Sequence, residues 1–333
     1  MEGVLRKGAE WPGAVGVSGG ADSLALLLLL ANWAAERGVP APVALTVDHG
    51  LQPHSRAQAE KVMQRAREHG LRAHVLRWGG RKPAADIEAA AREARYRLMG
   101  GWCARNGIRC LFVAHSLDDQ AETFLLRLMR GSGVDGLAAM AEVAPYPSPK
   151  CESLRLARPF LGVPRANLRA YLSGRNEPWF EDDMNTDARF ARARLRAAWP
   201  ALEAMGFSSG RIATAAGHLA RARAALDQDA SDLLTRASRK AGECVLLDGA
   251  AVAAAPEEIG NRCLARVLMQ VSGRFYRPRF NGLERLAVAI CSQDLKGGRT
   301  LHGCCIGPAS KREACFGPRT VRITPEHGSR GRH

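Results

Sequence analysis

The sequence contains no hydrophobic run long enough to cross a membrane. Its longest apolar stretch, Leu24 to Ala31, has eight residues, whereas a membrane-spanning helix needs about 20. The first twelve residues also lack the charged and apolar regions of a signal peptide. These absences predict a cytoplasmic protein without membrane contacts.

Closely paired cysteines are also missing. The nine cysteines are an odd number, and no two of them form a CxxC pair. This spacing favours neither a zinc ribbon nor a disulfide framework. Free cysteines are typical of a protein in a reducing cytosol.

Lysine is scarce, yet the chain is strongly basic. Only seven of the 48 basic residues are Lys, and 33 acidic residues leave a formal net charge of +15. A field of this sign favours polyanions, nucleic acid above all. The abundance of Arg, Ala and Gly, as in a GC-rich genome, is the competing explanation. Charge alone therefore favours a nucleic-acid partner over codon bias without establishing it.

The apolar pattern predicts an α/β domain with a doubly wound parallel sheet, because short β-like runs alternate with longer helical stretches. The predicted strands are residues 14–18, 43–48, 72–78 and 108–115. Gly38, Gly70 and Gly107 stand where helices would end, a place that favours a left-handed backbone.

The second half of the chain predicts a smaller, mainly helical domain. Prolines and an Arg-rich stretch interrupt the α/β pattern after residue 131, and helical periodicity resumes at 208. We expect a catalytic domain over 1–205, a C-terminal domain over 206–326 with short strands such as 244–247 and 320–323, and a flexible tail over 327–333.

The most informative segment follows the first predicted strand and runs into a helix. It reads Ser18-Gly19-Gly20-Ala21-Asp22-Ser23. Glycines let a backbone turn tightly against a ligand, and free N–H groups at a helix N-terminus bind phosphate. The loop matches neither GxxxxGK[ST] nor GxGxxG, so it predicts a phosphate site of another class. A plain strand-to-helix turn is the alternative.

Polar residues follow two further predicted strands. Asp48 and His49 close the second strand, and Asp119 and Glu122 open the helix after the fourth. Carboxyl ends of parallel strands face the ligand crevice, and a spacing of three puts both carboxylates on one helix face. Asp119 and Glu122 together could bind a divalent metal or an ammonium group. The alternative is a set of capped, solvated turns.

Arginines close this part of the chain. Arg92 and Arg95 lie on the preceding predicted helix and could reach the same edge, while Arg127 and Arg130 precede a glycine-rich connection. They could hold phosphates, although a helix C-terminus also favours cations.

Several segments, in order, resemble the tRNA(Ile)-lysidine synthetases, a branch of the PP-loop ATPases. They are SGGADS at 18, VDHGL at 47, AREARY at 91, AHSLDDQAET at 114, RLMRGSG at 127, RPFL at 158 and WFEDDMNTDARFARARLR at 179. The resemblance is good to about residue 205 and diffuse beyond it.

The resemblance implies a PP-loop fold like that of the adenine nucleotide α hydrolases and a ligase that modifies tRNA. Such enzymes use ATP, Mg2+ and free L-lysine to convert the cytidine at the first position of a CAU anticodon into lysidine. The C2 oxygen attacks the α-phosphate and pyrophosphate leaves; the lysine amine then displaces AMP.

The resemblance also implies roles for individual residues. ATP would bind at Ser18, Gly19, Gly20, Ala21, Asp22, Ser23, Asp48 and His49, with Asp22 holding Mg2+. The catalytic set would be Asp22, Arg95, Asp119 and Glu122. The tRNA and lysine would be bound by Asp119, Glu122, Arg127 and Arg130.

Two departures from the family accompany these matches. Gln52 stands where the family often has Arg. We also expect the further C-terminal domain of longer members to be absent or shortened here, which would affect how the predicted tRNA-binding domain over 206–326 holds its tRNA. The oligomeric state stays open, with a homodimer as one candidate.

Other functions remain as alternatives. A tRNA thiolase would share the ATP loop but normally needs CxxC cysteines. A basic RNA-binding module with a non-catalytic loop would not need acids at several strand ends, and an amidotransferase-type synthetase would need a glutaminase half.

Overall fold

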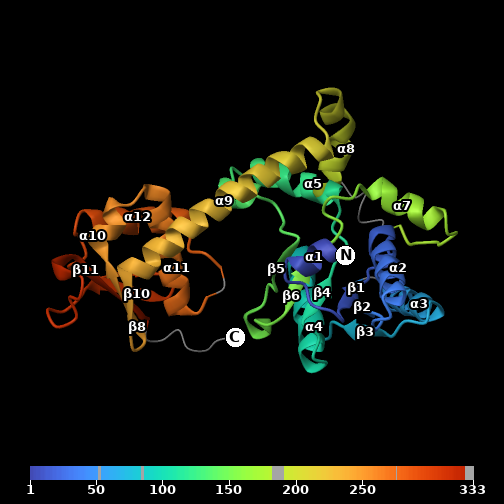
Figure 1. The fold of residues 1–333 in the computed structure, drawn as a ribbon, viewed down its shortest axis with the longest axis horizontal. Coiled ribbons are helices and arrows are strands. Elements are labelled where there is room, and N and C mark those ends of the chain that lie inside the picture. The colour runs from blue at the N-terminus through green and yellow to red at the C-terminus, as the bar shows by residue number, and fades with distance from the viewer. Residues whose placement is uncertain (52–53, 84–85, 182–190, 275, 327–333) are drawn as a thin grey trace. The chain divides into compact units, whose positions relative to one another are not determined.

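The chain folds into two compact units, Met1–Ala220 and Arg221–His333 (Figure 1). The computed structural model describes residues 1–51, 54–83, 86–181, 191–274 and 276–326. Gln52 and the predicted tail over 327–333 lie outside the described residues. The two units divide within helix α9 (Ser209–Ala237), later in the chain than residue 206.

The N-terminal unit is built on a six-stranded sheet with the order β3-β2-β1-β4-β6-β5. Every neighbouring pair is parallel except β5 with β6 at the edge. The strands are β1 (Ala14–Gly16), β2 (Val43–Asp48), β3 (Ala73–Arg77), β4 (Cys110–Phe112), β5 (Val143–Pro145) and β6 (Arg155–Ala157). The first four lie within the four predicted runs.

Helices alternate with these strands. They are α1 (Glu2–Arg6), α2 (Ala21–Glu36), α3 (Ser55–Glu68), α4 (Ile87–Arg105), α5 (Leu117–Leu128), α6 (Val134–Leu137), α7 (Arg165–Ser173) and α8 (Ala191–Ala204), with a 3-10 turn η1 (Pro149–Cys151). Gly38, Gly70 and Gly107 follow α2, α3 and α4 with φ of +62°, +73° and +66°, which confirms them as helix-terminating glycines.

Successive residues of each strand face opposite sides of the sheet, and both sides are covered. Val15 and Phe112 pack in one cluster with side chains of α2, α3 and α7. Their neighbours Ala14 and Leu111 pack in another with Tyr96 of α4. The sheet is therefore doubly wound.

The strand order brings two loops to one crevice. From β1 the chain proceeds outward to β2 and β3 on one side, and β4 and β6 lie on the other. The gap between the carboxyl ends of β1 and β4 is the topological switch point at which open α/β sheets bind ligands. The loop at residues 18–23 leaves β1, and helix α5 begins just after β4.

The C-terminal unit combines helices with an antiparallel sheet of order β7-β8-β11-β10-β9. Its elements are β7 (Ser238–Ala241), β8 (Cys244–Asp248), α10 (Gly249–Ala254), α11 (Glu257–Ser272), α12 (Phe280–Cys291), β9 (Arg299–Leu301), β10 (Cys304–Pro308), η3 (Gly317–Arg319) and β11 (Thr320–Pro325). The helices α11 and α12 share a buried core with the sheet. Among the described residues, none of the helices of either unit is long and apolar enough for a membrane span.

Candidate active site

The loop between β1 and α2 is held by its own hydroxyl groups. The Ser23 hydroxyl donates to the Gly20 carbonyl at 2.9 Å and accepts from the Ser18 N–H at 3.1 Å. The Ser18 hydroxyl lies 3.2 Å from that of Ser23. In the described chain no side chain caps α2, whose N-cap is Gly20, so this loop presents backbone N–H groups of the kind that bind phosphate.

Gly19 is required by both conformation and space. Its φ is +93°, and a Cβ there would lie 2.7 Å from Val62 and 2.9 Å from Phe180. The Phe180 N–H also donates to the Gly19 carbonyl at 3.0 Å. The tight turn predicted from the two glycines is therefore held by Val62 and Phe180, which pack against it from other parts of the chain.

Asp22, on the first turn of α2, has one paired and one unpaired carboxylate oxygen. Its Oδ2 accepts from Arg165 Nε at 3.2 Å, whereas Oδ1 is buried without a hydrogen-bond partner among the described residues. Burial raises the pKa of Asp22, against the lowering effect of Arg165. A buried orphan oxygen is a position for a ligand such as a metal ion.

Helix α5 begins with a capping box. The Ser116 N–H and hydroxyl donate to Asp119 Oδ2 at 2.8 and 2.9 Å, and the Asp119 N–H donates to the Ser116 hydroxyl. Asp119 is therefore partly structural, as the alternative interpretation of this turn expects. Burial alone would raise its pKa, but the Arg165 charge and the Ser116 hydrogen bonds outweigh burial and lower it.

Arg165, the first residue of α7, joins the acids of both loops. Besides Asp22, its guanidinium contacts Asp119 Oδ1 at 3.0 Å and Glu122 Oε1 at 3.5 Å. Its backbone N–H donates to Asp118 Oδ2 at 2.7 Å. The structure thus brings Asp22, Asp119 and Glu122 together around one cation.

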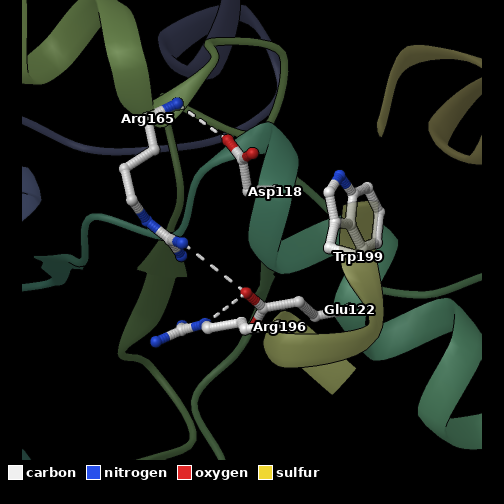
Figure 2. A pocket seen from close by; sticks show the side chains of 5 residues that line it. All are labelled: Asp118, Glu122, Arg165, Arg196 and Trp199. Carbon is white, nitrogen blue, oxygen red and sulfur yellow. Dashed lines mark hydrogen bonds and ion pairs between the residues drawn. The ribbon is translucent and has the colours of Figure 1, made fainter. Parts of the chain in front are cut away.

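A second arginine contacts Glu122, which is only 2% exposed. Arg196 of α8 donates through Nε to Oε1 at 2.6 Å and through Nη2 to Oε2 at 3.2 Å. With Asp118, Arg165 and Trp199 these two side chains line a cavity of about 200 Å3, which Figure 2 shows from close by. The cavity is small, and four of its five lining side chains are charged.

Asp48 and His49 lie at the end of β2, and Arg95 of α4 is near enough for its charge to act on His49. Asp48 Oδ1 accepts from the Gly50 N–H at 3.0 Å and the Ser55 hydroxyl at 2.8 Å, so it closes the turn into α3. The pKa of His49 is lowered by burial and by Arg95, and its Nδ1 has no partner among the described residues. That nitrogen is open to a ligand, whereas the Asp48 oxygen is engaged.

The two arginines predicted to bind substrate do not join the acidic cluster. Arg127 Nη1 donates to the carbonyls of Gly136 at 2.7 Å and Ala139 at 3.3 Å, so it holds the connection after α5. Arg130 is exposed. The structure leaves their contact with substrate a prediction.

The residues that sequence reasoning missed are Arg165, Arg196 and Trp199. Arg196 and Trp199 lie in or beside the Arg-rich stretch from 179, and Arg165 follows RPFL at 158. Both segments are among the family matches, but no local pattern connects them to acids distant in the chain. Residues 182–190 of that stretch lie outside the described residues.

Three kinds of comparison connect this geometry to known proteins. The PP-loop domain family matches residues 7–202. The tRNA(Ile)-lysidine synthase of Bradyrhizobium sp. (strain BTAi1) is 45% identical over 265 residues, 77% of this chain and 73% of that protein. The tRNA(Ile)-lysidine synthase of Methylobacterium nodulans is 41% identical over 305 residues, 89% of this chain and 85% of that protein.

A solved structure shares the fold at lower identity. The U34-tRNA thiolase NcsA from Methanococcus maripaludis, with its 4Fe-4S cluster, aligns with a TM-score of 0.52 and 18% identity over 62% of this chain and 72% of that chain. The likeness shows a common fold.

Proposed function

Because the chain belongs to the tRNA(Ile)-lysidine synthase family of PP-loop proteins, we propose that it ligates free L-lysine to C2 of the cytidine at the first anticodon position of tRNA(Ile), with release of AMP and pyrophosphate. The observation that carries the proposal is the acidic cluster of Asp22, Asp119 and Glu122 beside a phosphate-binding loop. The proposed reaction needs a loop that binds the phosphates of ATP and, next to it, carboxylates that bind the amine of lysine.

The loop over 18–23 would bind the leaving pyrophosphate. Backbone N–H groups at the N-terminus of α2 donate to phosphate oxygens, and the helix dipole favours their charge. Such donors stabilise charge that develops as the α–β bond breaks. His49, with its unpartnered Nδ1, is a further donor or acceptor for the nucleotide.

Asp22 fits an Mg2+ site. Among the described residues, no group of three His, Cys, Asp or Glu side chains could hold a metal. Mg2+ does not need one, since it is often bound by one or two carboxylates plus substrate phosphates and water. The orphan Oδ1 of Asp22 would be the protein ligand, and the ion would neutralise phosphate charge.

Asp119 and Glu122 would bind the lysine ε-ammonium group. They now contact the Arg165 guanidinium, a cation of the same charge as the substrate amine. The incoming ammonium would therefore take over contacts that Arg165 makes in the free protein. The lowered pKa of Asp119 keeps it ionised, which suits holding the ammonium better than removing its proton.

Four buried cysteines are unsuited to serve as the nucleophile of a tRNA thiolation reaction. Burial raises the pKa of Cys103 and Cys110 to about 12 and that of Cys263 and Cys304 to about 11. A thiol with so high a pKa is a poor nucleophile, because the thiolate is the reactive form.

The reaction is tested with α-labelled ATP, labelled lysine and tRNA transcripts that differ at the first anticodon base. We expect AMP, not ADP, and lysine transfer only to the transcript with C at that position. ADP as the main product, or transfer that ignores the base, would contradict the proposal.

The lysine site is tested by Asp119→Asn and Glu122→Gln, which keep shape but remove charge. We expect the apparent KM for lysine to rise by at least about tenfold, since a charged hydrogen bond is worth about 1.5–3 kcal/mol, while ATP binding changes little. Glu60→Gln, at an exposed ion pair with Arg56, is the control. An unchanged lysine dependence in both variants would return the two acids to a structural role.

A further inference from the structure

A second cavity lies wholly within the C-terminal unit. It has a volume of about 750 Å3, within the usual range of ligand sites. Its walls are the segment that precedes α12, the first turn of that helix and the end of β9. Gly282 lets the helix approach the strand, because a Cβ there would lie 2.8 Å from Leu301.

The cavity is positively charged. Four arginines, Arg274, Arg277, Arg279 and Arg285, line it, and no carboxylate is among its described lining residues. A counter-charge at its border is Asp227, 3.5 Å from Arg277. The cavity also opens at the N-terminus of the 12-residue helix α12, which no described side chain caps. Both features attract an anion.

Two aromatic rings stand exposed in the same cavity. Tyr276 is 65% and Phe280 58% exposed, although large apolar rings usually gain by burial. The Tyr276 ring meets the His302 imidazole edge to face, with centroids 5.2 Å apart. Exposed rings beside arginines provide stacking surfaces as well as charge.

The hairpin turn at His302 adds a polar group. His302 and Gly303 connect β9 to β10 with φ of +58° and +76°, an uncommon conformation for a residue other than glycine. His302 Nε2 is buried without a hydrogen-bond partner in the described chain. Burial and Arg274 lower the pKa of His302, so the ring is neutral at pH 7 and can donate to or accept from a base or hydroxyl.

We propose that this cavity binds an unpaired nucleotide of the RNA substrate, with arginines on its phosphates and its base stacked on Tyr276 or Phe280. Single-stranded RNA is recognised by this combination of aromatic stacking and arginine contacts. A paired helix would hide the base faces, so the site selects an unpaired segment. The inference rests on the proposed function, in that RNA is taken to be the substrate.

The test is RNA binding by the full chain, without ATP or lysine. Tyr276→Leu with Phe280→Leu removes stacking, and Arg279→Gln with Arg285→Gln removes charge. Arg312→Gln, exposed in the same unit but outside the cavity, is the control. Fluorescence anisotropy would compare a tRNA transcript, a 12-nucleotide single strand and a blunt RNA duplex, after thermal melting has shown that each variant is folded.

The aromatic variant should weaken binding of the tRNA and the single strand at least about fivefold, since stacking is worth about 1–3 kcal/mol per base. The affinity of the aromatic variant for the duplex should stay unchanged. The arginine variant should reduce the log–log salt slope for the single strand by about 0.7 for each phosphate that the protein no longer neutralises.

Three results would overturn the proposal. They are unchanged single-strand binding by both cavity variants, losses that Arg312→Gln reproduces, and equal losses on the duplex. Displacement of the single strand by AMP at equal molar concentration would also overturn it, in favour of a free-nucleotide site. If the cavity variants bind RNA as expected but the wild type transfers no lysine to tRNA, the proposed ligase reaction is wrong and the proposed RNA site is still supported.

Discussion

At the scale of single residues, Arg165 determines the electrostatics of the candidate active site. Burial alone would lower its pKa, but the charges of Asp119, Glu122 and Asp22 raise it. The same ion pairs keep three carboxylates close together that would otherwise repel one another. Arg165 is therefore a structural counter-ion in the free protein. It would compete with any cationic substrate for the same three carboxylates.

Arg165→Gln should lower the free energy of unfolding by about 3 kcal/mol. The substitution removes one cationic partner from each of three largely buried carboxylates, which then repel one another. Urea unfolding followed by tryptophan fluorescence measures the loss. Arg169→Gln, in an exposed pair with Glu181, should cost less than about 1 kcal/mol.

Free lysine supplies a second measurement on the same variant. If its ammonium group binds the carboxylates that Arg165 vacates, added lysine should stabilise Arg165→Gln more than the wild type. Equal losses in the two arginine variants, with no extra effect of lysine, would show that Arg165 is not the counter-ion that we describe.

At the scale of elements, local signals were predictable and long-range contacts were not. The strands and the loop over 18–23 follow from short apolar runs, glycines and capping residues, whose effects act within a few positions of the chain. Arg165 is 143 positions from Asp22, and Arg196 is 74 from Glu122. These charges come together only because α7 and α8 pack beside α5 and the loop over 18–23. The periodicity of the sequence does not predict that packing.

The C-terminal sheet was predictable only in part for a related reason. Expected strands at 244–247 and 320–323 lie within β8 and β11, but β7 and β9 are exposed along most of their length and have no alternating apolar pattern. Their pairing depends on partners far along the chain. Strands of this kind gain their structure from the sheet and not from their own sequence.

Gly19→Ala tests the loop as an element. The substitution should abolish ATP-dependent pyrophosphate release, because the left-handed backbone is strained by about 1–2 kcal/mol and the new Cβ would clash with Val62 and Phe180. Gly38→Ala is the matched control, since its φ is also positive but no atom lies within 4 Å of the new Cβ.

The control should lose about 1 kcal/mol of stability and keep its activity. Pyrophosphate release and circular dichroism on both proteins would decide. Normal release from Gly19→Ala would show that neither the close approach nor the backbone geometry of this loop matters for ATP.

At the scale of the whole molecule, the two units can be followed separately. All six tryptophans lie at or before residue 199, within the N-terminal unit. Tryptophan fluorescence therefore reports unfolding of that unit alone, which matters because a chain of two units need not unfold in one step. The free energy of unfolding measured with this signal at different pH values tests how the buried ionisable groups around the sheet affect stability.

His115, in the connection between β4 and α5, should dominate that pH dependence. Burial lowers its pKa to about 3, with Arg158 and Arg92 acting in the same direction and Asp119 opposing them. The unfolded chain therefore takes up a proton near pH 6.5 that the folded chain refuses, and stability falls as the pH drops from about 6.5 toward 3. Between pH 7.5 and 5 this one group should cost about 2 kcal/mol.

His115→Gln removes the titrating group, so the variant should lose about 2 kcal/mol less than the wild type over that range. The raised pKa of Asp22 and the lowered pKa of His49 act in both proteins and cancel in the difference. His218→Gln, at an exposed position in the same unit, should follow the wild type. Parallel pH profiles for wild type and His115→Gln would mean that His115 is protonated in the folded protein, and hence that the crevice between β1 and β4 is wetter than its buried side chains indicate.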